Sequence, residues 1–493
     1  SLLHLCITFF TDRQIFTVSP KEGAADYILC KCLAYAALFF FYLALYHLLI
    51  DKNRKEQPIT KIIKCALPYL IVLAVVMVIK LPGGYLSNDE TLIYNAAVSL
   101  THYTWFYYIT TYYYIVSLML IPNYFGPIMI KILIEFLTVG YFVYRLKRIL
   151  GNSYGSFGYL LFLLYPVIAY TTSAHRLPIY YLLYLVLITT LLFDYMEKKE
   201  LHASKALSLL FLGAILTQWR TEGIYLVVLL PILLFLVYKN IRTKKNALAV
   251  VFSFLLIQYI VSVPQNGLLP NNMDAAANDR MKPFYAYTIT NMVRNNLNRE
   301  KNAEDLAIVD QYLSLDTMDA INDYYGDINY EDVLILYKEG YIGTRPDATI
   351  EDFTNYAAAL KRIFINNPGV FLKTRWGAFC YAALPYKITF EGLQLRQLFS
   401  FAVSIVKTIS YNLFIPLSII LLLCIYALVK RRWFTFFTAG GLLAHWFIVF
   451  ILAPASYFKY YFPVYIIAYF YVLLLILQLV YNRKQHENLH FIV

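Results

Sequence analysis

The chain has 493 residues, of which 60% are hydrophobic, 18% are aromatic and only 15% are charged. Soluble globular proteins average about 45–50% apolar and about 25% charged residues, so this composition excludes an ordinary soluble enzyme. The formal net charge is +12, but the basic residues lie in short segments between long apolar blocks, which is typical of the cytoplasmic loops of membrane proteins. We therefore expect an all-α polytopic membrane protein with membrane lipid around it and no nucleic-acid partner.

A membrane-spanning helix needs about 20 mostly apolar residues. The segment Leu2–Phe10 resembles the end of one such helix, which gives about 11–12 transmembrane helices in total. The other eleven blocks are 27–50, 65–81, 127–144, 157–173, 178–194, 206–218, 223–238, 246–263, 411–429, 433–453 and 463–481. Lys and Arg are concentrated in every second loop, and this alternation predicts a multi-pass protein of the cell membrane with a cytoplasmic C-terminus.

Three regions follow from these blocks. Residues 1–263 form an N-terminal transmembrane module with a first external loop at 81–126, residues 264–398 form an external, mostly helical domain, and residues 399–493 form a C-terminal transmembrane module. In the first loop, the aromatic stretch Thr91–Ile121 predicts one or two helices in the membrane interface.

The external domain is expected to contain several helices. Thr349 is a predicted N-cap with Asp352 three residues later. The predicted helices are Ala303–Leu315, Thr317–Tyr325, Glu331–Glu339 and Ile350–Asn366, followed by an interfacial helix at Val370–Leu384.

Two carboxylates follow a Pro/Gly turn after an early apolar block, Asp89 and Glu90. A carboxylate at the outer membrane edge can act as a general base on an acceptor hydroxyl, or hold a divalent cation such as Mg²⁺ or Mn²⁺. The alternative is local: Ser87 or Asn88 caps a short helix, and the two acidic side chains favour its positive end. Both interpretations are compatible.

Other ionisable residues occupy the predicted outer edge. Arg220 lies between two apolar blocks and can bind a phosphate with two hydrogen bonds, or pair with Glu222 to hold a hairpin. Arg176 offers the same phosphate contact, or anchors its helix at the headgroup level. His175 and His102 are included in the candidate substrate-binding set, although lone histidines are more often structural.

A late segment combines one cation with aromatic side chains: Lys459 is flanked by Tyr457, Tyr460 and Tyr461. Aromatic faces can stack on a sugar while the ammonium group contacts phosphate; the alternative is an aromatic belt with one snorkelling lysine. Five ionisable residues in or near the apolar blocks are interpreted as lying near helix ends or in the interface, namely Lys31, His47, Lys131, Glu135 and Lys407.

The acidic pair Asp89-Glu90, the Arg220-Thr221-Glu222-Gly223 hairpin and the Ser456–Pro463 segment together resemble the C-type membrane glycosyltransferases, including protein O-mannosyltransferases and aminoarabinose transferases. Many bacterial members have an arginine where this chain has Lys459. The resemblance implies an inverting transfer of a sugar from a polyprenyl-phosphate donor, at the extracytoplasmic face, to an external glycan, lipid or protein.

In that family pattern, Asp89 is the base and Glu90 assists through hydrogen bonds or a metal. Arg220, Lys459 and Arg176 neutralise the lipid phosphate, and segment 264–398 covers the cleft or binds the acceptor. Two alternatives stay open. A polysaccharide polymerase or ligase uses a lipid-linked oligosaccharide at the same face, and a lipid-linked glycan flippase or transporter also needs outward cations.

Overall fold

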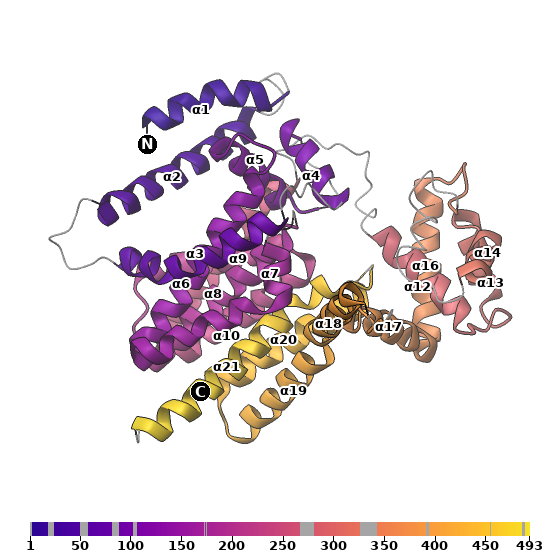
Figure 1. Cartoon of the computed structure of the whole chain (residues 1–493). Helices are drawn as coiled ribbons and strands as arrows, with labels where there is room; N and C mark the ends of the chain where they lie inside the picture. Colours follow the sequence, from indigo (N-terminus) through magenta and orange to yellow (C-terminus); the bar gives the residue numbers. More distant parts are fainter. Residues whose placement is uncertain are drawn as a thin grey trace. The chain divides into compact units, whose positions relative to one another are not determined.

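The structure is a computed structural model. It describes residues 2–17, 24–49, 58–80, 88–101, 106–171, 173, 175–266, 281–325, 343–390, 394–453, 455–485 and 489–493. Within these ranges the regular structure is helical (Figure 1), with a single isolated bridge between Leu313 and Thr344. The all-α prediction is therefore confirmed for the described residues.

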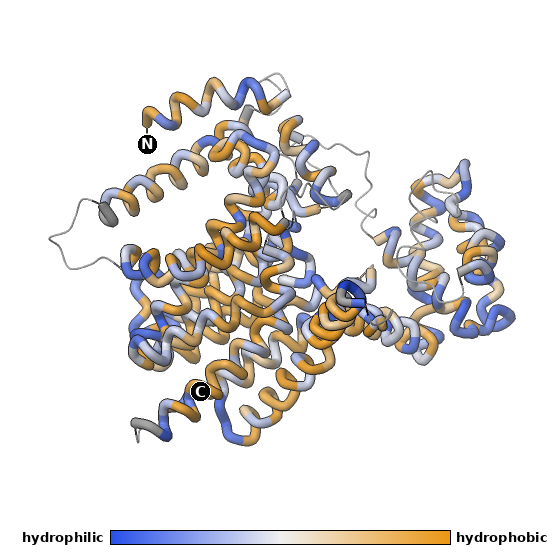
Figure 2. Tube along the Cα trace, viewed as in Figure 1, coloured by the Kyte–Doolittle hydropathy of each residue, from blue (hydrophilic) through white to orange (hydrophobic). Residues whose placement is uncertain are grey.

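Eight helical stretches in the described ranges are long and apolar enough to cross a membrane. They are Ala25–Tyr46, Pro58–Ile79, Gly126–Leu163, Leu177–Met196, Lys244–Gln265, Arg396–Val429, Trp433–Leu452 and Phe458–Arg483. Figure 2 shows the long hydrophobic stretches along these helices. The number is smaller than the eleven predicted blocks because the blocks at 206–218 and 223–238 form the shorter apolar helices Ala203–Trp219 and Thr221–Val237, and two other blocks share one continuous stretch.

The chain divides into two compact units. The first comprises Ser1–Met273, Pro416–His445 and Phe462–Val493, and the second comprises Asp274–Ile415 and Trp446–Tyr461. The second unit thus includes a late segment that the predicted boundaries at 264 and 398 do not contain. That the domain lies outside the membrane stays a prediction.

The helices of the first unit begin near the N-terminus and continue to η4. They are α1 (Leu2–Ile15), α2 (Ala24–Leu49), α3 (Pro58–Lys80), α4 (Asn88–Val98), α5 (Tyr108–Leu120), α6 (Gly126–Gly155), η1 (Ser156–Leu163), α7 (Tyr165–Thr171), α8 (Leu177–Met196), α9 (Ala203–Trp219), η2 (Thr221–Tyr225), α10 (Leu226–Val237), η3 (Lys239–Ile241), α11 (Lys244–Ser262) and η4 (Val263–Asn266). Later come α19 (Phe414–Val429), α20 (Trp433–Leu452) and α21 (Phe462–Gln485), of which α19 and α20 contribute to both units.

The chain reverses direction inside the stretch Gly126–Leu163. Gly151 has φ +79° and ψ 172°, a conformation that glycine adopts without steric cost. After the turn η1 returns along α6: Gly158 lies against Leu146, while Phe162 packs on Phe142 with ring centroids 6.0 Å apart. The blocks predicted at 127–144 and 157–173 are therefore two antiparallel segments, and the second is formed by η1 and the short α7.

Close backbone approach fixes two other helix pairs. A Cβ on Gly140 of α6 would lie 2.4 Å from the carbonyl oxygen of Ile62 in α3. A Cβ on Gly213 of α9 would lie 2.3 Å from a methyl group of Leu230 in α10. Small residues allow membrane helices to pack closely: Gly140 brings α6 against the backbone of α3, and Gly213 leaves room for the Leu230 side chain between α9 and α10.

The predicted aromatic stretch of the first loop forms two helices, α4 and α5. The side chains of Tyr108, Tyr112 and Tyr114 are buried in a core shared with residues of α1, α2 and α4. The Tyr112 hydroxyl donates a hydrogen bond to the buried carboxylate of Asp26 in α2. These aromatic residues therefore contribute to a protein core, whereas the sequence predicted only an interfacial position for them.

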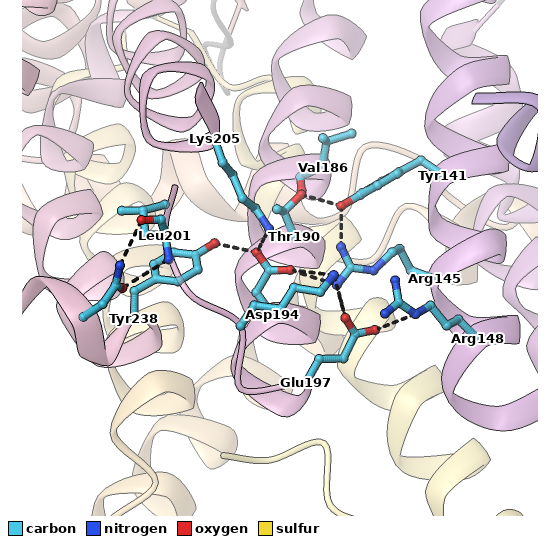
Figure 3. A network of polar contacts seen from close by, with 12 residues as sticks. Tyr141, Arg145, Arg148, Val186, Thr190, Asp194, Glu197, Leu201, Lys205 and Tyr238 are labelled. Carbon is cyan, nitrogen blue, oxygen red and sulfur yellow. Dashed lines mark hydrogen bonds and ion pairs between the residues drawn. The ribbon is translucent and has the colours of Figure 1, made fainter. Parts of the chain in front are cut away.

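A network of buried ion pairs joins the ends of α6, α8 and α9 (Figure 3). The carboxylate of Asp194 is fully buried and pairs with Lys205 and with Arg145, the latter at 3.1 Å, and it accepts a hydrogen bond from the Tyr238 hydroxyl. Arg145 also lies 3.7 Å from Glu197. Three loops that the charge pattern placed on the same side of the membrane, around residues 145, 199 and 239, meet here.

The second unit contains α12 (Lys282–Arg294), α13 (Ala303–Tyr312), α14 (Leu315–Tyr325), α16 (Ile350–Asn366), α17 (Pro368–Ala383), α18 (Leu395–Ser410) and η6 (Phe458–Tyr461). The predicted helix at Ile350–Asn366 is confirmed with both of its ends. Thr349 and Asp352 form the predicted capping box, in which the Asp352 amide donates to the Thr349 hydroxyl at 3.2 Å. The helix predicted at Glu331–Glu339 lies outside the described residues.

One arginine of the second unit was expected in an interfacial helix but is fully buried. Arg375 of α17 donates hydrogen bonds to the carbonyl oxygens of Phe450 and Ala453, each at 2.7 Å. These carbonyls belong to the end of α20, where the last helical carbonyls have no partner within the helix. Burial lowers the pKa of the Arg375 guanidinium, but an arginine remains charged under ordinary conditions.

Candidate functional site

The acidic pair lies in the first turn of α4, which begins at Asn88. Amide groups at a helix N-terminus favour negative charge, so the local interpretation of this pair fits its position. The two side chains differ in environment: Glu90 is fully buried, whereas Asp89 is partly exposed. Adjacent helical residues point in different directions, and this separates the roles that the two carboxylates can take.

Glu90 is held by two basic residues that precede α8. A guanidinium nitrogen of Arg176 donates to Glu90 Oε1 at 2.7 Å, and the Arg176 amide lies 3.4 Å from the same oxygen. The Nδ1 atom of His175 lies 3.3 Å from Oε2. The Arg176 guanidinium also covers the ring of Phe106 at 4.0 Å. The structure thus brings together three predicted site residues that are up to 86 positions apart in sequence.

A buried lysine supports the segment that carries His175 and Arg176. Lys131 of α6 is 1% exposed, and its ammonium group donates to the carbonyl oxygens of Tyr170 at 3.0 Å, His175 at 3.1 Å and Ser173. A buried ammonium group that satisfies three carbonyls of one loop fixes the path of that loop. Lys131 thus lies within the first two turns of α6, and its ammonium group is buried in the protein, where the sequence indicated only a near-end or interfacial position.

Glu135, one helical turn after Lys131, is also fully buried. Its carboxylate accepts hydrogen bonds from the Tyr69 hydroxyl at 2.8 Å and from Thr171. The sequence analysis interpreted both residues as near-end or interfacial, although two ionisable residues four positions apart inside an apolar block are also a signal of a polar site within the membrane.

The Arg220 hairpin contains the local ion pair that was one of its two interpretations. Arg220 Nε donates to Glu222 Oε1 at 2.5 Å. A Cβ on Gly223 would lie 2.5 Å from the carbonyl oxygen of Leu216, so only glycine fits the close return of the chain. The phosphate-binding interpretation of Arg220 stays a prediction. Trp219, which directly precedes Arg220, contacts α5: the ring centroids of Trp219 and Tyr113 lie 5.7 Å apart.

A buried group of polar aromatic residues lies beside this hairpin and was missed from the sequence. The ring of His445 in α20 stacks on Tyr180 of α8 at 6.2 Å and meets the edge of Tyr225 at 5.7 Å. Apolar blocks rich in tyrosine are common in this chain, and only the tertiary packing selects these members.

The late cationic segment belongs to the second unit. The ammonium group of Lys459 lies over the ring of Tyr457, 4.7 Å from its centroid, and the rings of Tyr457 and Tyr460 are 5.8 Å apart. Tyr461 is buried against Phe379, with centroids 5.3 Å apart. The remaining predicted site residue, His102, lies outside the described residues.

A divalent cation does not fit at Glu90 as the structure has it. The carboxylate is buried and contacts the guanidinium of Arg176 and the ring of His175, and a positive neighbour at this distance opposes a second cation. Among the described residues, no group of three or more His, Cys, Asp or Glu side chains is arranged as a metal site.

The chain matches no protein-family model, no curated protein and no solved structure.

Proposed function

We propose that the protein is an integral-membrane glycosyltransferase that moves a sugar from a polyprenyl-phosphate-linked donor to an extracytoplasmic acceptor, with inversion at the sugar carbon. In this proposal Asp89 is the general base that removes the proton of the acceptor hydroxyl. Glu90 positions the turn through its contacts with Arg176 and His175. The proposal rests on the resemblance of the Asp89-Glu90 pair to C-type glycosyltransferases and on the different environments of the two carboxylates.

The observation that carries the proposal is the availability of Asp89. Within the described part of the chain, no hydrogen bond or ion pair involves the Asp89 side chain, which is partly exposed. Glu90 next to it is occupied by two basic partners. The oxygens of Glu90 face Arg176 and His175, so the Asp89 carboxylate is the one that an acceptor hydroxyl can reach.

A cation beside the acidic pair, Arg176, supports the handling of a lipid phosphate. Glu90 Oε1 accepts from one nitrogen of the Arg176 side chain, and a guanidinium has five N–H donors. By the family resemblance alone, Arg220 at the α9–η2 turn and Lys459 in η6 are two further candidates for the phosphate. Fixed positive groups stabilise the charge that develops on the departing phosphate, which is usually the largest contribution to such catalysis.

A lipid-linked glycan transporter is the second candidate, because one observation favours it. Glu135 is fully buried within α6, in a stretch long and apolar enough to span a membrane. Buried ionisable residues inside such stretches are common in transport pathways.

The test is a transfer assay with the full-length protein in liposomes, using a panel of labelled polyprenyl-phosphate sugars and an external acceptor. We expect Asp89→Asn to lower the transfer rate by about 10²–10⁴, the usual contribution of a general base. Asp323→Asn is the matched control, since Asp323 is an exposed carboxylate of α14, and it should keep the wild-type rate.

Two results would overturn the proposal. Full transfer by Asp89→Asn contradicts the role of the base. If the wild type transfers no sugar but moves labelled lipid-linked sugar across the bilayer, the protein is a transporter. Product length separates the remaining alternative, because a polymerase yields a ladder of products where a simple transferase adds one sugar.

A further inference from the structure

A cavity of about 690 Å³ lies in the first unit and is lined by four basic residues from two separate loops. They are Arg242 and Lys244, before and at the start of α11, and Arg431 and Arg432, between α19 and α20. No Asp or Glu side chain lines the cavity. Among the described residues, no carboxylate forms an ion pair with Lys244, Arg431 or Arg432, and these three side chains are exposed.

The cavity lies where the apolar helices end. Lys244 and Trp433 are the first residues of two stretches that are long enough to span a membrane, and Tyr195 is next to the last residue of a third. The wall beside the cations is apolar and includes Leu236 and Phe434. Tryptophan and tyrosine favour the level of the lipid headgroups, so this cavity joins cations to an apolar wall at the boundary of the membrane.

The backbone of Arg431 is unusual for its residue type. Its φ is +54°, in the left-handed region that favours glycine. Here it ends α19: the amide of Arg432 donates to the carbonyl oxygen of Ala427 at 2.7 Å, which is the bond pattern of a glycine-type helix end. An arginine therefore stands where glycine would be less strained, at a position that lines the cavity.

The guanidinium of Arg242 is fixed at the cavity edge. Its Nε donates to the carbonyl oxygen of Phe235 at 3.0 Å, and a terminal nitrogen donates to Leu236 at 2.9 Å. These carbonyls lie at the end of α10, which Arg242 therefore caps. The cation is held in place without a carboxylate partner, so its positive charge remains directed at the cavity.

We propose that this cavity binds the phosphate headgroup of an anionic phospholipid. Arginine and lysine supply the donors that phosphate prefers, and basic pockets between membrane helices are suited to anionic headgroups. The apolar wall suits the glycerol and acyl portion, and Leu248 and Phe252 of the adjoining α11 are exposed. A soluble phosphate would use only the cations. The proposal is independent of the proposed glycosyl transfer.

The alternative is that these basic residues only set the orientation of the protein in the membrane. That effect depends on how many basic residues a loop has and not on which of them line a cavity. Lys245 therefore provides a matched control. It is exposed, follows Lys244 directly and does not line the cavity. If position matters, Lys245→Gln leaves lipid binding unchanged, while changes at Arg431 and Arg432 weaken it.

The experiment measures thermal unfolding and native mass spectra of the full chain in detergent, with dioleoylphosphatidylglycerol, dioleoylphosphatidylcholine or inorganic phosphate added. We expect phosphatidylglycerol alone to raise the Tm and to stay bound in the mass spectra. In the double variant Arg431→Gln/Arg432→Gln its apparent affinity should fall roughly thirtyfold, from the usual contribution of two basic residues at a membrane surface. Lys245→Gln should match the wild type.

One variant separates lipid binding from folding. Arg431→Gly suits the left-handed backbone, so we expect the lipid-free protein to be at least as stable as the wild type and yet to respond less to phosphatidylglycerol. Three results overturn the proposal: an unchanged response in the double variant, an equal loss in Lys245→Gln, or a Tm increase of the same size from inorganic phosphate, which would identify a soluble anion instead.

Discussion

Replacing Lys131 by methionine tests how the protein holds the segment before α8. Methionine has a similar length and fills the same space, but it cannot donate a hydrogen bond. The carbonyl oxygens of Tyr170, Ser173 and His175 then lose their common donor in a buried place. Hydrogen bonds to a charged group contribute about 1.5–3 kcal/mol each and do not simply add, so we expect the free energy of unfolding to fall by about 3–5 kcal/mol.

The measurement is denaturant-induced unfolding of the purified protein in mixed micelles. Lys407→Met is the matched control: this lysine is partly exposed and lies 5.4 Å from the ring centroid of Tyr386, a contact worth about 0.5–1 kcal/mol. Hydrogen exchange should also become faster at residues 175–177 in Lys131→Met, since the released carbonyls no longer restrain that loop.

A second variant shows whether charge or hydrogen bonding dominates. Lys131→Met leaves the carboxylate of Glu135 buried without its neighbouring cation, so Lys131→Met combined with Glu135→Gln should recover part of the lost stability. A free energy of unfolding of Lys131→Met within about 0.5 kcal/mol of the wild-type value, the usual range for an uninvolved surface position, would show that Lys131 does not hold this loop in place.

Three other substitutions have measurable outcomes. Gly140→Ala should destabilise the protein by about 1–3 kcal/mol because its Cβ meets backbone and side-chain atoms of α3. The control Gly440→Ala has open space around it and should be neutral or slightly stabilising. Equal melting temperatures of the two variants would contradict the close packing at Gly140. Asp194→Asn leaves several cations around a buried neutral group, and a loss of about 3–5 kcal/mol is expected; a wild-type unfolding curve would contradict it. Hydrogen bonds within the capping box lower the pKa of Asp352. The stability that this carboxylate contributes is therefore fully present above the unfolded pKa of about 3.9 and is lost as the pH falls through the lower folded pKa. Asp352→Asn, but not Asp323→Asn, should remove this part of the pH dependence of the Tm.

Local signals predicted the elements whose causes are local. The helix Ile350–Asn366 has both ends in the sequence, a capping box at Thr349 and a proline just after Asn367. The hairpin at Arg220 was predicted from two apolar blocks with almost no loop between them, and the turn at Gly223 allows it. In such cases the hydrogen bonds that end a helix are made by residues a few positions away.

The candidate site was predicted only in part. Glu90, His175 and Arg176 were each selected from the sequence because ionisable residues at a membrane edge are costly, but their mutual contact was not. Lys131 was given a position near the interface, and its three carbonyl partners could not be foreseen. An ammonium group inside an apolar block indicates that partners exist, and the chain positions of those partners depend on the packing.

The sequence by itself determined that this is a helical membrane protein, because hydrophobic stretches of this length are stable only where water is excluded and each backbone group pairs within its own helix. The sequence also showed that few ionisable residues lie at the predicted outer membrane edge, among them Glu90, His175 and Arg176. The tertiary structure alone decided that Glu90 is occupied while Asp89 stays accessible, and that Arg431 and Lys244 line one cavity. Contacts between residues that are far apart in the chain depend on how the helices pack, and hydrophobic periodicity carries no information about partners.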